Sequence, residues 1–211
     1  MSDSKIRDLR VGADGGILHR MSTQSFALFD TAVGRCGIAW SDAGIVGVQL
    51  PERHENATRA RLQKRYPEAR EASPPSSIQQ VIDSITRLLC GEKPDLSHVA
   101  LDMNGLTAFQ RRVYAVARTI VPGATLSYGE IAARLGDRGA AREVGEAMGQ
   151  NPFPIIVPCH RVLAAGGKVG GFSASGGVTT KLRLLDIEGA QIGEAPALFG
   201  SLPLAARPQR R

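Results

Sequence analysis

The segment Asn151–Gly167 reads NPFPIIVPCHRVLAAGG and holds one cysteine between an apolar run and a basic pair. The run PIIV and a proline precede Cys159, and His160 and Arg161 follow it directly. We expect the apolar run to form a buried, strand-like segment that fixes the backbone while the sulfur faces a cleft. The adjacent imidazole and guanidinium would place two cations beside the thiol and stabilise the thiolate, the nucleophilic form of cysteine.

Two other interpretations of Cys159 stay open on the residues alone. A lone cysteine after an apolar run is often a small buried packing residue. A zinc site needs about four ligands at suitable spacing, whereas the other cysteines and histidines are scattered singly along the chain, at Cys36, Cys90, His19, His54 and His98. The spacing argues against a metal site but does not choose between a packing residue and a nucleophile.

Length and composition limit the class of protein. The 211 residues suffice for one large or two small domains, and 43% hydrophobic residues are ordinary for a globular chain. No apolar run approaches the roughly 18 residues that cross a bilayer, and the N-terminus lacks the apolar stretch of a secretory signal. Three cysteines without a C-x-x-C pair predict free thiols in a cytoplasmic, reducing compartment. The net charge of +6 lies mostly in the second half and favours a polyanionic partner only weakly.

The first half of the chain is predicted to be an antiparallel sheet with helices. Three short strands separated by turn residues indicate a meander: SFALFD (25–30), CGIAWS (36–41) and GIVGVQL (44–50). Two helices and a further strand are expected after them, at 55–66, 78–89 and 98–103. Ser77 is a plausible N-cap of the second helix. We predict a domain over residues 23–100, preceded by a flexible segment 1–22.

The second half is predicted to be mostly helical. Helices are expected at 108–120, 128–135, 140–150 and 178–189. Ser127 and Glu130 spell the S-x-x-E capping box that opens the second of them, and Gly189 would end the last. The two short helices joined by a glycine-bearing turn form a helix-turn-helix pattern, which any helical corner also produces. The predicted fold class is α+β, with a winged-helix-like C-terminal domain over 101–190 and a tail at 191–211.

Residues 105–190 resemble the DNA O6-alkylguanine alkyltransferases, also called methylated-DNA–protein-cysteine methyltransferases. The resemblance rests on motifs in the family's order and spacing: FQRRVYAVARTIVPG (109–123), SYGEIAARLG (127–136), AAREVGEAMG (140–149), GQNPFPIIV (149–157), PCHRV (158–162), GGFS (170–173) and LLDIEG (184–189). The first half resembles the family's N-terminal domain only in its strand-and-helix layout, which is ribonuclease-H-like.

The resemblance implies a stoichiometric, irreversible transfer of an alkyl group from guanine O6 in DNA to Cys159, without a cofactor. His160 would act as the base through a water molecule, and Glu188 would hold His160 in place. This is the nucleophile, base and orienter arrangement of a catalytic triad. On the residues alone, Glu188 reads equally as a solvated carboxylate at a helix end.

The resemblance also implies how DNA is bound. Tyr128 would help to turn the nucleotide out of the duplex and donate its hydroxyl to guanine N3, because O6 is unreachable inside the stack. Arg142 would take the place of the flipped nucleobase, with Ala141 and Gly145 on the same helix in the minor groove. The alternative for Arg142 is a surface ion pair with Glu146, four residues further along the helix.

Further residues are implied to form the reaction pocket. Asn151 would tie the recognition helix to the segment that carries the cysteine. Met148, Val162 and Phe172 would line the alkyl pocket, and Ser173 would give a backbone N–H to guanine O6. Some relatives bind zinc in the N-terminal domain, but the scattered ligands of this chain do not reproduce that set. We therefore expect no metal and no cofactor.

The sequence as a whole predicts a DNA-repair alkyltransferase that acts once on double-stranded DNA containing O6-alkylguanine. We expect a monomer located with the nucleoid and without a membrane partner. Two alternatives are a module that binds alkylated DNA without reacting and a Cys-His-Glu hydrolase. The first would not need Cys159, and the second would not need Tyr128, Arg142 or the helix-turn-helix.

Overall fold

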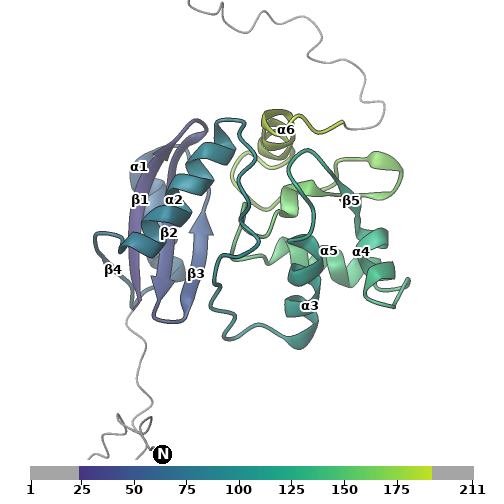
Figure 1. Cartoon of the computed structure of the whole chain (residues 1–211), viewed down its shortest axis with the longest axis horizontal. Helices are drawn as coiled ribbons and strands as arrows, with labels where there is room; N and C mark the ends of the chain where they lie inside the picture. Colours follow the sequence, from purple (N-terminus) through teal and green to yellow (C-terminus); the bar gives the residue numbers. More distant parts are fainter. Residues whose placement is uncertain (1–23, 192–211) are drawn as a thin grey trace, which may run out of the picture.

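The computed structural model describes residues 24–191, so the predictions for 1–22 and for the tail after 191 lie outside the described residues. Figure 1 shows a sheet with its helices beside a second, mostly helical half. The sheet has the strand order β3-β2-β1-β4, with β4 parallel to β1 and the other pairs antiparallel. Its strands are β1 (Ser25–Thr31), β2 (Gly34–Ser41), β3 (Gly44–Gln49) and β4 (Arg70–Glu71). The α+β class and the predicted meander are confirmed.

Alternation along the strands gives the sheet two buried faces. Phe26 and Ala39 pack against Leu62 of helix α1 (Glu55–Arg65) on one face. Ala27 of β1 and Ile38 of β2 join the core beneath helix α2 (Ser76–Leu89). Successive side chains of a strand point to opposite faces, so β1 and β2 each contribute residues to both layers. Each helix covers one face of the sheet.

Two details of the first half differ from the sequence prediction. Helix α2 starts at Ser76 after Pro75, and no side chain caps it, so Ser77 is not its N-cap. Proline presets a backbone angle that suits the start of a helix. Segment 98–103 is not a strand: it makes one parallel bridge, Ile45 with Leu101, before it leaves the sheet.

The second half contains the predicted helices with slightly shorter bounds. They are α3 (Ala108–Ala117), α4 (Tyr128–Arg134), α5 (Ala141–Gly149) and α6 (Val178–Ile187). A short parallel pair joins β5 (Leu126–Ser127) to β6 (Val162–Leu163), and 3-10 turns lie at η1 (Cys159–Arg161) and η2 (Ala165–Gly167). The β5–β6 pair brings the start of α4 beside the residues that follow Cys159.

Caps and turns define the helix-turn-helix. The Ser127 side chain accepts from the Glu130 backbone N–H, and the Glu130 carboxylate accepts from the Ser127 backbone N–H, which confirms the capping box at the start of α4. Helices α4 and α5 pack on each other after the turn at 136–140. Gly189, with φ at +68°, ends α6 as predicted.

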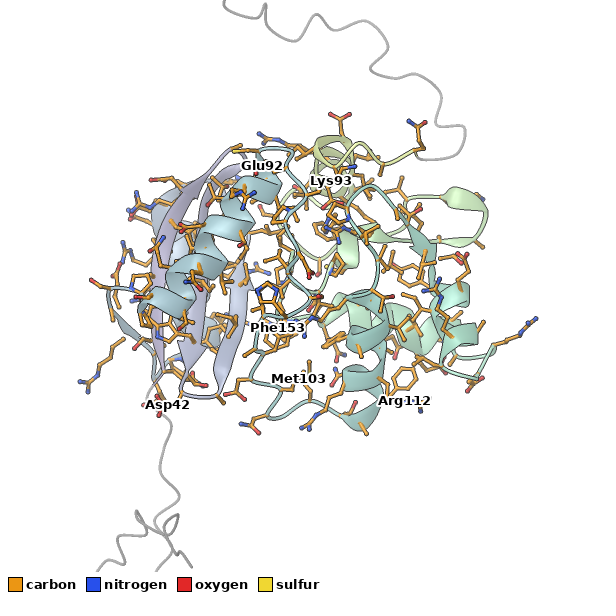
Figure 2. All side chains as sticks on the ribbon, viewed as in Figure 1. Asp42, Glu92, Lys93, Met103, Arg112 and Phe153 are labelled. Carbon is orange, nitrogen blue, oxygen red and sulfur yellow. The ribbon has the colours of Figure 1, made fainter. Side chains whose placement is uncertain are left out.

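The two halves share one core. A single cluster of buried apolar side chains runs from β1–β3 and α2 to α3, α4 and α5. Phe153 lies between the halves in Figure 2 and packs edge-to-face on Tyr114, with 6.4 Å between ring centroids. The β3 backbone also reaches across, since the N–H of Val48 donates to the carbonyl of Pro152 at 2.9 Å. The predicted boundary at residue 100 stays a prediction.

Candidate functional site

The backbone before Cys159 is a buried turn and not the strand-like run that the sequence suggested. Asn151 closes this turn: its amide Nδ2 donates to the carbonyl of Val157 at 2.7 Å, and its Oδ1 accepts from the N–H of Phe153 at 2.9 Å. Asn151 thereby joins the end of α5 to the residues that lead into Cys159. A strand was expected because a short apolar run has no periodicity that separates a strand from a buried turn.

The same turn contains a strained residue. Ile155 has φ at +76°, the one non-glycine residue with positive φ among residues 24–191, and it is 1% exposed. A β-branched residue in this conformation costs on the order of 1–3 kcal/mol, so the surrounding contacts must hold it in place. The strain lies four residues before Cys159 and fixes the direction in which the chain enters η1.

Behind Cys159, three side chains form a buried cluster. His160 Nε2 lies 2.9 Å from Glu188 Oε1, and Arg161 donates two hydrogen bonds to the same carboxylate, at 2.8 and 2.7 Å. All three side chains are at most 6% exposed. The carboxylate therefore holds the imidazole through Nε2 and leaves Nδ1 to exchange a proton.

The pKa values of this cluster fix its charges. Burial alone would raise the pKa of Glu188, but the hydrogen bonds and charges of His160 and Arg161 outweigh it and hold this pKa at about 2. Burial lowers the pKa of His160 against the opposing effect of Glu188. At neutral pH the cluster is a carboxylate paired with a guanidinium and with a neutral imidazole, which is a competent proton acceptor.

The thiol itself does not have the two cationic neighbours that the sequence suggested. The side chains of His160 and Arg161 both turn to Glu188, and no hydrogen bond within residues 24–191 joins the sulfur to the imidazole. Cys159 is 7% exposed, and burial raises its pKa, against the Asn151 amide and the charge of Lys181. In the free protein Cys159 is therefore mainly a neutral thiol.

Lys181 is the cation that sequence reasoning missed. It is fully buried on α6, its ammonium donates to the carbonyl of Val162 at 2.6 Å, and it lies 5.9 Å from the centroid of the Tyr128 ring. Burial lowers its pKa to about 8, while the charge of Cys159 opposes this shift. A lysine at this position therefore stabilises the thiolate more than any side chain adjacent in sequence.

Two cavities meet at Cys159. The first, which we call the α5 cavity, has a volume of about 410 Å³ and is lined by Tyr128, Gly145, Met148, Gly149, Cys159, Gly171, Phe172 and Ser173. The second, which we call the α1 cavity, has a volume of about 570 Å³ and reaches from Cys159 to helix α1. Both volumes lie in the range of small-molecule sites.

The structure thus brings most of the predicted pocket residues to one cavity. Tyr128, Met148, Phe172 and Ser173 line the α5 cavity with the sulfur. Burial raises the pKa of Tyr128, so its hydroxyl keeps its proton. Val162 differs from the expectation, because its side chain is fully buried and lines neither cavity.

Helix α5 presents its remaining predicted residues outward. The Arg142 side chain is 89% exposed and its Nε lies 3.3 Å from Glu146 Oε1, so the surface ion pair considered from the sequence is present. Ala141 and Gly145 lie half-buried on the same helix, and a Cβ on Gly145 would stand 3.9 Å from the Tyr128 ring. A small residue at this position lets α5 approach α4 and the tyrosine closely.

Other features of the described chain bear on the alternatives. Among residues 24–191, no three His, Cys, Asp or Glu side chains gather in a way that could hold a metal ion. The three cysteines are unpaired, with Cys36 buried and Cys90 exposed. Burial raises the pKa of Cys36 to about 12, so it is unreactive at neutral pH. No helix in this part of the chain is long and apolar enough to span a membrane.

Fold and site together define a helix-turn-helix protein with a buried cysteine at a small-molecule-sized cavity. A family model described as 6-O-methylguanine DNA methyltransferase, DNA binding domain, matches residues 108–190. The methylated-DNA–protein-cysteine methyltransferase of Methanothermobacter thermautotrophicus is 39% identical over 156 residues, which are 74% of this chain and 80% of the relative. That of Mycobacterium bovis is 43% identical over 125 residues, which are 59% and 73% of the two chains.

The solved structures of relatives have a similar fold. The crystal structure of Mycobacterium tuberculosis OGT in complex with DNA superposes with a TM-score of 0.63 at 34% identity, over 78% of this chain and 92% of that one. This chain belongs to the methylated-DNA–protein-cysteine methyltransferase family.

The ionisation of Glu188 makes the free energy of unfolding depend on pH. Its pKa is about 2 in the folded chain, against an ordinary value of 4.5. Because the folded value is depressed, the stabilisation is complete above pH 4.5 and is lost as the pH falls toward 2. We expect this group to remove roughly 3 kcal/mol from the free energy of unfolding over that window, measurable by urea titration at each pH. If the Glu188→Gln variant loses the same free energy of unfolding over this pH window, other carboxylates cause the loss.

Proposed function

We propose that this protein repairs DNA by direct reversal, transferring the alkyl group of O6-alkylguanine to Cys159 in one irreversible step. The observation that carries the proposal is the position of the sulfur. It lines the α5 cavity together with Tyr128 and Met148 of the helix-turn-helix, and a buried His160–Glu188 pair follows it in the chain. Relatives that match most of the chain are named for the transfer of a methyl group from methylated DNA to a protein cysteine.

The bond changes balance without a cofactor. The thiol of Cys159 gives its proton through a water molecule to Nδ1 of His160, and Glu188 stabilises the imidazolium. The sulfur then attacks the alkyl carbon, an S–C bond forms, the C–O6 bond breaks, and its electron pair goes to the purine. The proton ends on guanine. The product is a thioether, which no group in the site hydrolyses, so each chain reacts once.

The raised pKa of Cys159 suits this order of events. A thiol that stays neutral in the free protein is protected from other electrophiles and from oxidation. The Lys181 ammonium and the neutral imidazole supply the charge and the proton acceptor when a substrate fills the cavity. Tyr128 keeps its proton and lines the α5 cavity, which supports its proposed role as the donor to guanine N3.

The nucleobase must leave the duplex to reach the sulfur. Cys159 is buried, so a stacked guanine cannot bring its O6 in line with it. Arg142 at the start of α5 is free of the core and is the side chain that would enter the stack. We infer that the partner is double-stranded DNA, bound through the minor groove by a monomer located with the nucleoid.

Arg142→Ala tests the flipping role. Transfer from duplex O6-methylguanine should slow by about tenfold or more, because flipping costs a few kcal/mol, while transfer from the free nucleobase should change little. Single-turnover rates on both substrates measure this. Glu146→Gln is the companion variant: it frees Arg142 and removes a negative charge near phosphates, so duplex affinity should rise. Equal losses of Arg142→Ala on both substrates would make the arginine structural.

Intact mass separates this function from the alternatives. With excess O6-methylguanine duplex, each chain should gain the mass of one methylene, as a methyl group replaces the thiol hydrogen, and then stop. A hydrolase would turn over without keeping a mass increment. A pure binding module would bind and gain nothing, and either result would overturn the proposal.

A further inference from the structure

The α1 cavity joins the two halves of the molecule at the reactive sulfur. It shares Gly149, Cys159, Phe172 and Ser173 with the α5 cavity. Its other walls include Val48 and Gln49 of β3, Asn151 and Pro154 of the turn before Cys159, and the last turns of α1. Three cationic residues of α1, namely Arg61, Lys64 and Arg65, form part of the same wall.

The geometry of the transfer gives this cavity a use. In an in-line displacement the sulfur, the alkyl carbon and O6 lie on one line, so whatever else the carbon bears projects sideways from that line. The proposed function places the purine in the α5 cavity. A substituent longer than methyl then has the α1 cavity, which Cys159 also lines, as a space to enter.

The charges on α1 give the cavity a preference. Arg61 lies 3.2 Å from Glu52, which also accepts from Gln49, so its charge is offset. Lys64 and Arg65 are exposed, and no carboxylate in residues 24–191 lies within ion-pair distance of either. Cations in the last turn of a helix offset its macrodipole. The macrodipole explains why Lys64 and Arg65 stand in the last turn of α1. It does not explain why both residues line a cavity that Cys159 also lines.

We propose that the α1 cavity receives the substituent of the O6 adduct and that Lys64 and Arg65 favour substituents ending in an anionic group such as a carboxylate. The proposal rests on the proposed function and adds a substrate class to it. Arg65 lies over the Tyr66 ring, 5.7 Å from its centroid, but neither it nor Lys64 forms an ion pair within residues 24–191. A carboxylate that enters the α1 cavity is therefore attracted by two uncompensated positive charges, whereas an uncharged substituent of equal size is not.

Two matched duplexes test the preference. They share one sequence and carry either O6-carboxymethylguanine or O6-carbamoylmethylguanine, whose adducts have nearly the same shape and differ in charge. Single-turnover transfer is measured by intact mass for the wild type and for the Lys64→Gln/Arg65→Gln double variant. We expect the double variant to lose roughly fivefold in the rate ratio of carboxylate to amide, as two exposed ion pairs would give. The loss should shrink as salt rises.

Control variants separate the sources of charge. Arg70→Gln/Arg87→Gln removes the same charge from residues outside the cavity and should leave the ratio unaltered. Lys64→Glu/Arg65→Glu should invert the preference. If Lys64 and Arg65 contact DNA phosphates instead, both duplexes lose rate equally and the ratio stays constant, which overturns the proposal. If the wild type transfers methyl but the rate ratio of carboxylate to amide is the same in every variant, the charge preference is wrong and the proposed function stands. If no duplex gives any transfer, the proposed function itself is wrong.

Discussion

Replacing Cys159 with serine is expected to abolish the methyl increment and to leave duplex binding intact. Serine has nearly the same size, so the buried turn and η1 should keep their packing. Its hydroxyl is a far weaker nucleophile than a thiolate and its pKa lies well beyond the reach of a neutral imidazole. The residues on the outer face of α5 are untouched by the change. Intact mass after incubation with O6-methylguanine duplex, together with a binding titration, measures both parts.

Cys90→Ser is the matched control, because Cys90 is the exposed thiol of the described chain. This variant should gain the methyl group as the wild type does. Buried Cys36, whose pKa is raised to about 12, should stay unmodified in all variants. Transfer that persists in Cys159→Ser, or peptide mapping that places the methyl on Cys90, would end the assignment of the nucleophile.

Local sequence patterns predicted most of the helices and strands. Short apolar segments separated by turn residues predicted strands β1, β2 and β3, and the capping box predicted the first residue of α4. The errors arose where a longer-range contact decides the outcome. Segment 98–103 has strand-like residues but only one bridge partner, since the chain must leave the sheet there to reach α3. The run before Cys159 is buried and apolar, as a core strand would be. It forms a turn because the Asn151 side chain hydrogen-bonds its backbone, and no periodicity in the sequence indicates that contact.

The site was predictable in its residues but not in its electrostatics. Adjacency in sequence suggested that His160 and Arg161 would be cations beside the thiol. Both side chains instead turn away from the sulfur of Cys159 and contact Glu188. A signal for the missing cation was present in α6. Lys181 and Glu188 share a face with Leu184 and Leu185 at the i, i+3, i+4, i+7 spacing, and all four are buried. Charged residues within an apolar stripe indicate a buried site.

Glu188→Gln is expected to damage both stability and transfer. The amide keeps the shape of the carboxylate but leaves Arg161 as a buried charge without its counterion, which typically costs about 3–5 kcal/mol. His160 loses the carboxylate that opposes the burial effect on its pKa, so the imidazole becomes a weaker base. We expect transfer to slow by roughly a hundredfold, the scale of lost general-base assistance. Asp186→Asn, which removes an exposed carboxylate from the same helix, should change neither quantity.

A second substitution separates the two effects of Glu188. In Glu188→Gln/Arg161→Met both members of the buried ion pair are gone, so most of the lost unfolding free energy should return. Transfer should stay slow, because His160 still has no carboxylate, and the acid limb of its pH–rate profile should lie at lower pH than in the wild type. If restored stability brought back the full rate with an unshifted profile, Glu188 would serve only to neutralise Arg161. In that case the proton of Cys159 would have to leave by a route other than the His160–Glu188 pair.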